Sequence, residues 1–285
     1  MENKKCFLIA PSGYITQNNL DIAKKRLKNL GFEKIFYRED ILSRHFDYAG
    51  SKKRRIAEIN EAYSSEAEII FSVIGGQGAI HLLEEIDYDL ISKSKKILVG
   101  LSDITILLNS IYQKTGARCI HGSNIGKELA INEKTIKYLF KAIRKEPYEI
   151  SFKQKDVVNS GKIEGEIVGG NIELLGRSLG TQNEINTDNK ILFLEEFDMK
   201  SWRVLDILWQ LKFAGKFDKI KGLILGKFIN CGENIDDYIN EFFSYLKVLI
   251  IKNQEIGHNE PNIAIPLGEK CVIDTKIFKW NILFD

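Results

Sequence analysis

The sequence has few cysteines, little proline and no long apolar run. Its 285 residues include 4 Cys and 4 Pro. The cysteines are Cys6, Cys119, Cys231 and Cys271, which lie far apart and form no C-x-x-C pair. This scatter excludes a disulfide framework and the usual zinc-site spacing. We therefore expect buried thiols in a reducing cytoplasm, and neither a metal nor another cofactor.

Signals for export, membrane insertion and nucleic-acid binding are also missing. A short apolar stretch follows Lys5 but stops at Pro11, and the longest apolar runs, such as 247–252, are far below the roughly 20 residues of a spanning helix. The formal net charge of +2 is too balanced to create a broad basic field. We expect neither a membrane nor a nucleic acid as partner.

The patterning predicts an α/β protein with two domains. In residues 1–146, short apolar runs at 6–10, 34–37, 68–74, 97–101 and 118–121 alternate with helical patterns at 18–30, 51–64, from 79 and 103–115. Such alternation is typical of a parallel sheet with crossover helices. The polar passage 147–164 is expected to link this domain to a smaller mixed α/β domain over 165–285. There we expect strands at 166–168, 191–194, 222–225 and 271–274, and helices at 172–179, 204–213 and 236–249.

Two loops of the first domain are candidates for chemistry. Ser102 lies in the tight turn between the apolar strand 97–101 and a helix, as a nucleophile does at the elbow of a hydrolase, although G-x-S-x-G is absent. The competing interpretation is an N-cap. The segment 75–78, Gly-Gly-Gln-Gly, ends the preceding strand, so the amides of Gly76 and Asp103 can form an oxyanion hole beside Ser102. A phosphate-binding loop and a plain turn are the alternatives.

A serine nucleophile needs a base and an orienting carboxylate. Of the four histidines, His45, His81 and His121 suit structural or solvated positions, whereas His258 stands in a loop before the final strands. Glu195 follows an apolar strand and is the preferred acid, but spacing does not exclude Glu196. Arg203 is a candidate clamp for a substrate carboxylate, with a solvated helix start as the alternative.

Motifs along nearly the whole chain resemble those of the LD-carboxypeptidases, serine peptidases of bacterial cell-wall recycling that are also called muramoyl-tetrapeptide carboxypeptidases. The matching segments are 10–13 (APSG), 48–50 (YAG), 75–78 (GGQG), 100–105 (GLSDIT), 121–122 (HG), 164–165 (EG), 169–171 (GGN), 193–196 (FLEE), 226–228 (GKF), 257–258 (GH) and 266–268 (PLG). Three positions depart from the family pattern: Ile74, Gln77 and Ser51. These changes leave the triad residues intact but alter the expected contacts with substrate.

The resemblance implies a flavodoxin-like or amidotransferase-like amino-terminal domain, a cytoplasmic homodimer, and a triad of Ser102, His258 and Glu195 with an oxyanion hole at Gly76 and Asp103. The expected reaction is removal of the terminal D-alanine from a murein tetrapeptide, without metal or cofactor. One alternative is the microcin-immunity branch, which cleaves peptide or aminoacyl nucleotide conjugates. The other is a non-catalytic binding module in which Ser102 is only a cap.

Overall fold

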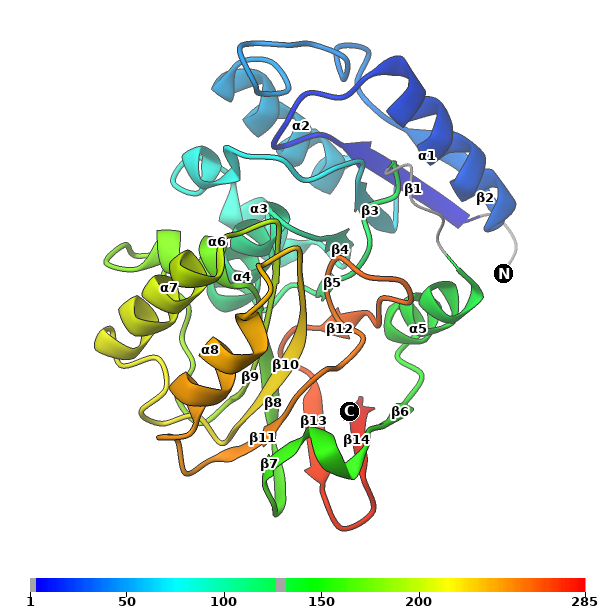
Figure 1. Cartoon of the computed structure of the whole chain (residues 1–285). Coiled ribbons are helices and arrows are strands. Elements are labelled where there is room, and N and C mark those ends of the chain that lie inside the picture. The colour runs from blue at the N-terminus through cyan, green and yellow to red at the C-terminus, as the bar shows by residue number, and fades with distance from the viewer. Residues whose placement is uncertain (1–3, 127–131, 285) are drawn as a thin grey trace. The chain divides into compact units, whose positions relative to one another are not determined.

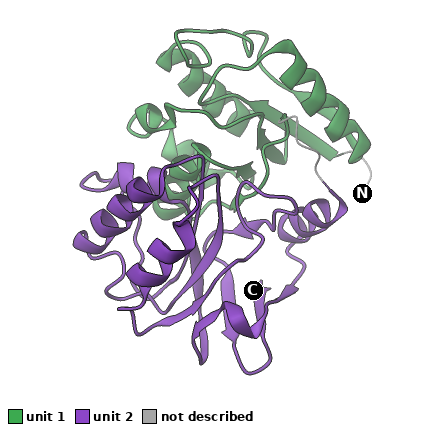
Figure 2. Ribbon diagram, viewed as in Figure 1, with its two compact units in different colours: residues 1–131 green, residues 132–285 purple. Residues whose placement is uncertain are grey.

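The computed structural model describes residues 4–126 and 132–284, and the chain forms two compact units, residues 1–131 and 132–285 (Figure 2). No helix within these described ranges is both long enough and apolar enough to span a bilayer. The division at 131/132 comes earlier than the expected passage at 147–164. The second unit is consequently the longer of the two, whereas the sequence indicated a smaller carboxyl-terminal domain.

The first unit contains a parallel sheet with the spatial order β2-β1-β3-β4-β5. Its strands are β1 (Lys4–Ile9), β2 (Phe32–Phe36), β3 (Ile69–Ser72), β4 (Ile97–Gly100) and β5 (Cys119–His121). All residues of β3, β4 and β5 are buried, as expected for parallel strands covered on both faces. This is the flavodoxin-like order, in which ligands bind at the carboxyl ends of the strands near the switch between β1 and β3.

Four helices and one 3-10 turn complete the first unit. They are α1 (Gln17–Asn29), α2 (Lys52–Ser64), η1 (Ala79–Leu82), α3 (Tyr88–Lys93) and α4 (Ile104–Thr115). The Ser51 hydroxyl accepts a hydrogen bond from the Arg54 amide and so caps α2. The helical pattern after residue 79 yields only the short η1 before α3 begins.

The second unit is built on an eight-stranded mixed sheet with the order β6-β14-β13-β8-β9-β10-β11-β7 (Figure 1). The strands are β6 (Tyr148–Ser151), β7 (Val157–Asn159), β8 (Lys162–Asn171), β9 (Ile191–Phe197), β10 (Gly222–Ile229), β11 (Leu249–Ile251), β13 (Lys270–Asp274) and β14 (Lys279–Leu283). The central strands β8 to β11 are parallel. Only the short η2 (Gln154–Asp156) separates β6 from β7, so the two edges of the sheet curl toward each other.

The remaining elements of the second unit are α5 (Glu133–Arg144), α6 (Ile172–Ser178), α7 (Ser201–Phe213), α8 (Ile235–Phe243) and the two-residue β12 (Ile265–Pro266). Helices α6, α7 and α8 lie side by side along the strands β8 to β10 (Figure 1). Their apolar sides, including Val204, Leu208 and Phe243, are buried. This packing fixes the carboxyl end of β9, where the candidate acid lies.

Two sequence expectations differ from the structure. The passage 147–164 forms β6, β7 and the start of β8 and is not a linker. Its composition is polar because an edge strand alternates buried and exposed residues: in β6, Tyr148 and Ile150 are buried while their neighbours are exposed. The helix expected over 236–249 ends at Phe243. Leu249 instead begins β11, where it pairs with Gly222 of β10.

Candidate active site

Ser102 lies on a strained turn between β4 and α4. Its φ of +68° is in the left-handed region, which a residue other than glycine seldom occupies. A side chain at Gly100 would place its Cβ 2.5 Å from Ile104, so the tight entry into the helix requires glycine there. No side chain caps α4 by a hydrogen bond. The N-cap interpretation of Ser102 is therefore wrong.

Neighbouring residues hold this turn on both sides. The Asn124 side chain accepts from the Leu101 amide (3.1 Å) and donates to the Leu101 carbonyl (3.2 Å). The buried Asp103 carboxylate accepts from the Ala79 amide at 2.8 Å, which joins the turn to the glycine segment. The Ser102 carbonyl accepts from Thr105. Asn124 has no local sequence signal, because its role depends on a partner 23 residues away.

The glycine segment packs directly against Ser102. A Cβ on Gly75 would lie 2.8 Å from the Ser102 Cβ and 3.1 Å from its Oγ. Gly76 has φ +104°, and a Cβ there would come within 2.9 Å of the Gly13 backbone. The Gly13 amide donates to the Gly75 carbonyl at 3.1 Å. The loops after β1, β3 and β4 are thus in mutual contact at one edge of the sheet.

In the second unit, β9 brings Glu195 to His258. Glu195 Oε2 and His258 Nδ1 are 2.8 Å apart, and both side chains are buried. The Phe197 ring stacks on the imidazole with a centroid distance of 4.8 Å and an angle of 17°. This arrangement fixes the ring plane and favours the tautomer that carries its proton on Nδ1, which leaves Nε2 able to accept one.

The backbone around His258 is closely fitted to Glu195. Gly257 has φ +117°, and a Cβ there would lie 2.6 Å from Glu195 Oε2. The Gly257 amide donates to the Asn262 side chain (3.0 Å), and the Asn262 amide donates to the Thr135 hydroxyl (2.9 Å). The loop that carries His258 is therefore anchored to α5 and not left mobile as its sequence position suggests.

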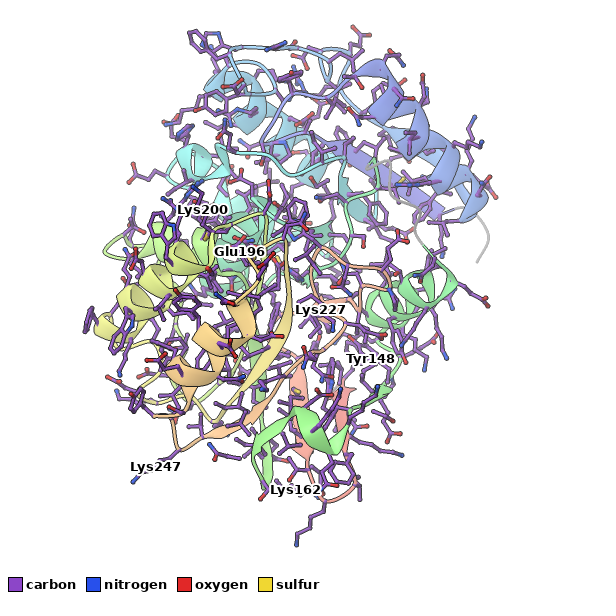
Figure 3. All side chains as sticks on the ribbon, in the orientation of Figure 1. Tyr148, Lys162, Glu196, Lys200, Lys227 and Lys247 are labelled. Atoms are coloured by element: carbon purple, nitrogen blue, oxygen red, sulfur yellow. The ribbon has the colours of Figure 1, made fainter. Side chains whose placement is uncertain are left out.

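Glu196 points to different partners from those of Glu195. Its carboxylate accepts from the Asn171 side chain (2.7 Å), the Phe197 amide (2.8 Å) and the Glu173 amide (3.1 Å). It lies at the carboxyl end of β9 (Figure 3). Burial, together with the nearby charge of Glu195, raises the pKa of Glu196 to about 7. Of the two consecutive glutamates, only Glu195 contacts the imidazole.

The other candidates from the sequence lie elsewhere. His45 packs against Phe46, His81 makes an edge contact with Tyr48, and His121 is buried at the end of β5. Arg203 is exposed and forms an ion pair with Glu173 at 3.1 Å through one guanidinium nitrogen, and its role as a carboxylate clamp stays a prediction.

Metal ligands and disulfides can be assessed over the residues that the structure describes. Within residues 4–126 and 132–284, no group of three or more His, Cys, Asp and Glu side chains is arranged to hold a metal ion. The four cysteines are buried and unbridged, as the sequence predicts.

Comparison with known proteins identifies the family. Models of the LD-carboxypeptidase N-terminal and C-terminal domains match residues 7–122 and 164–273. The probable murein peptide carboxypeptidase of Bacillus subtilis (strain 168) is 30% identical over 283 residues, which cover 94% of this chain and 88% of that protein. This chain belongs to the LD-carboxypeptidase family.

A second branch of the family is also represented. The Microcin C7 self-immunity protein of Escherichia coli is 29% identical over 270 residues, which cover 80% of this chain and 78% of that protein. A solved structure of a Microcin C7 self-immunity protein in complex with aspartyl sulfamoyl adenosine superimposes with a TM-score of 0.91 at 25% identity, covering 100% of this chain and 97% of that chain. The two-domain α/β fold class predicted from the sequence is confirmed.

Proposed function

We propose that this LD-carboxypeptidase family member is a serine carboxypeptidase that removes the terminal D-alanine from murein tetrapeptides. The observation that carries the proposal is the buried hydrogen bond between Glu195 Oε2 and His258 Nδ1. A histidine held in this way is the general base that a serine nucleophile requires. The murein peptide carboxypeptidase relative supports the substrate class.

The nucleophile in this proposal is Ser102. Its left-handed conformation presents the hydroxyl at the carboxyl end of β4, beside the loops that follow β1 and β3. His258 removes the hydroxyl proton as Oγ attacks the carbonyl carbon of the scissile amide, and it returns that proton to the amine of the leaving D-alanine. A water molecule then hydrolyses the acyl-enzyme with the same base. Glu195 holds the imidazole and stabilises its charged form.

The tetrahedral oxyanion would be stabilised by the amides of Gly76 and Asp103. Gly76 follows Gly75, which is in contact with Ser102, and Asp103 is the next residue after the nucleophile. Asp103 is the N-cap residue directly before α4, whose first-turn N–H groups carry the positive end of the helix dipole. Loss of one such donor typically lowers kcat by about 10²- to 10³-fold.

The test is D-alanine release from the peptide L-Ala, D-Glu, meso-diaminopimelate, D-Ala by the purified protein, beside Ser102→Ala and with fluorophosphonate labelling of the serine. Release that disappears in Ser102→Ala supports the proposal. Labelling of Ser102 without D-alanine release contradicts the proposed substrate but still supports a serine hydrolase. Absence of both contradicts the serine mechanism, and ligand-induced thermal stabilisation that survives Ser102→Ala would then favour a binding module.

A second candidate activity is cleavage of an aminoacyl nucleotide conjugate. The relatives include a self-immunity protein, and a solved neighbour is a complex with aspartyl sulfamoyl adenosine. Gln77 is exposed in the glycine segment, where it departs from the family pattern that the sequence otherwise resembles. The same assay with an aspartyl adenylate analogue separates the two: preference for the nucleotide conjugate by kcat/KM would favour the immunity-type reaction.

A further inference from the structure

Arg55 joins two of the loops that surround Ser102. It lies in the first turn of α2 and is only 2% exposed. Its Nη1 donates to the Pro11 carbonyl at 3.0 Å and to the Gly78 carbonyl at 2.9 Å. Pro11 follows β1 and Gly78 ends the glycine segment after β3, so one guanidinium spans the switch point of the sheet.

Hydrogen bonds hold the glycine segment at both of its ends. The Gly78 carbonyl is bound by Arg55, and the next amide, of Ala79, is bound by the Asp103 carboxylate at 2.8 Å. Further back in the segment, the Gly75 carbonyl accepts from the Gly13 amide. The Gly76 N–H shares its peptide plane with the Gly75 carbonyl, so the Gly13 contact orients it directly. The contacts of Arg55 and Asp103 fix the chain two to three residues further on and so limit the tilt of that plane.

Tyr48 completes the enclosure of Gly78. The Arg55 guanidinium lies 4.9 Å from the centroid of the Tyr48 ring. A Cβ on Gly78, which has φ +101°, would be 2.7 Å from that ring and 3.0 Å from Arg55 Nη1. Gly78 thus packs against an aromatic ring and a cation, with no space for a side chain.

The placement of Arg55 carries a local cost. Its Nε is buried and has no hydrogen-bond partner among the described residues, and an unsatisfied buried donor is unfavourable. Burial lowers the pKa of Arg55, although the Asp103 charge opposes this shift. The adjacent Arg54 differs because it donates to both Glu58 oxygens, at 2.5 and 3.2 Å, and to the Ala10 and Ala49 carbonyls.

We infer that Arg55 is a positioning residue for the oxyanion hole, which it aligns by binding the Pro11 and Gly78 carbonyls and thereby fixing the Gly76 amide. This inference rests on the proposed function, since it assigns Arg55 to the oxyanion site of that reaction. The oxyanion forms only in the transition state, so misalignment of a donor lowers kcat and leaves KM nearly unchanged.

The experiment compares Arg55→Ala and Arg55→Lys with the matched controls Arg54→Ala and Arg54→Lys. Measurements are kcat and KM for D-alanine release, the second-order rate of fluorophosphonate labelling of Ser102, and Tm. We expect Arg55→Ala to lose about 10- to 100-fold in kcat and in labelling rate, less than complete loss of a donor. Arg55→Lys should retain more, and millimolar guanidinium should partly restore Arg55→Ala. The Arg54 variants should lower Tm, keep kcat within about threefold, and gain nothing from guanidinium.

The inference is overturned if Arg55→Ala, measured at a temperature at which it is folded, keeps the kcat and the labelling rate of the intact protein. It is also overturned if both Arg54 and Arg55 variants lose activity in proportion to Tm, because a structural role alone would do that. Fluorophosphonate labelling does not depend on the peptide substrate. If the intact protein is labelled but releases no D-alanine, the proposed substrate is contradicted, and the labelling rates of the Arg55 variants still test the role of Arg55. Intact protein without labelling contradicts the serine mechanism and this role together.

Discussion

Replacing Gly75 by alanine tests whether the contact between the glycine segment and Ser102 lies at the reaction centre. The added Cβ would lie 2.8 Å from the Ser102 Cβ, whereas ordinary contacts begin at 3.4 Å, so one of the two must move by at least about 0.6 Å. The φ of Gly75 is not in the left-handed region, so alanine introduces no backbone strain. Displacement of a reacting group by about 1 Å costs about 10²-fold in rate, or about 2.7 kcal/mol of activation free energy.

The effect on folding should be much smaller. Overpacking by one methyl group typically costs about 1–3 kcal/mol, which for a chain of this size lowers Tm by several degrees. Activity at 25 °C would be measured by D-alanine release and by Ser102 labelling. Gly161→Ala is the control, because its Cβ would meet only Leu249, at 3.7 Å, and its rate should stay within about twofold. If Gly75→Ala turned over within threefold of the intact protein, this segment would not border the reacting atoms.

Three further variants address the carboxylates of β9. Glu195→Gln should lower kcat by about 10⁴-fold, because the amide cannot hold the imidazole in the right tautomer; D-alanine release that falls less than tenfold would contradict the triad. Gly257→Ala should lower both kcat and Tm, since its Cβ would lie 2.6 Å from Glu195 Oε2 at φ +117°, and unchanged melting would refute this close fit. For Glu196 the pKa is raised from 4.5 to about 7, so its neutral form stabilises the fold below about pH 4.5 and that contribution is lost as the pH rises through 7. Glu196→Gln should therefore lessen the decline in unfolding free energy between pH 5 and 8 measured with urea, and an unchanged decline would count against the shift.

Much of the first unit could be predicted from the sequence because β3, β4 and β5 are short, apolar and buried on both faces. The expected runs at 97–101 and 118–121 correspond to β4 and β5 within about one residue. The second unit was harder, since β6 and β7 pair with strands about 90 to 130 residues away. A polar edge strand of this kind has no local signal that separates it from a linker.

The site shows the same division between local and distant information. The position of Ser102 between an apolar strand and a helix is a local feature. The choice between Glu195 and Glu196 is not, because adjacent residues of a strand face opposite sides and only the path of the loop 256–262 places His258 on one of them. Sequence spacing left both glutamates open for this reason.

Arg55 was missed although a signal for it existed. The helix over 51–64 starts with four consecutive basic residues, of which Arg54 and Arg55 are buried while Lys52 and Lys53 are exposed. Arg55 precedes Ile59 and Ala62 by four and seven residues, so it lies on the same buried helix face as they do. A cation at such spacing needs polar partners inside the protein, and here they are two loop carbonyls.

Several of the proposed catalytic groups carry local costs. Ser102 occupies a left-handed conformation without capping a helix, and such conformations cost about 1–3 kcal/mol each. Asn189 and Asp198 share this conformation, which their residue types tolerate, and Lys145 adopts it at the end of α5. Phe46 and Phe278 also adopt it, so the conformation is not confined to the proposed site. The buried carboxylate of Glu195 is another unfavourable group that its surroundings must stabilise. Folding alone does not require a serine at position 102 or an arginine with an unpartnered Nε at position 55, whereas the proposed reaction gives each of them a role.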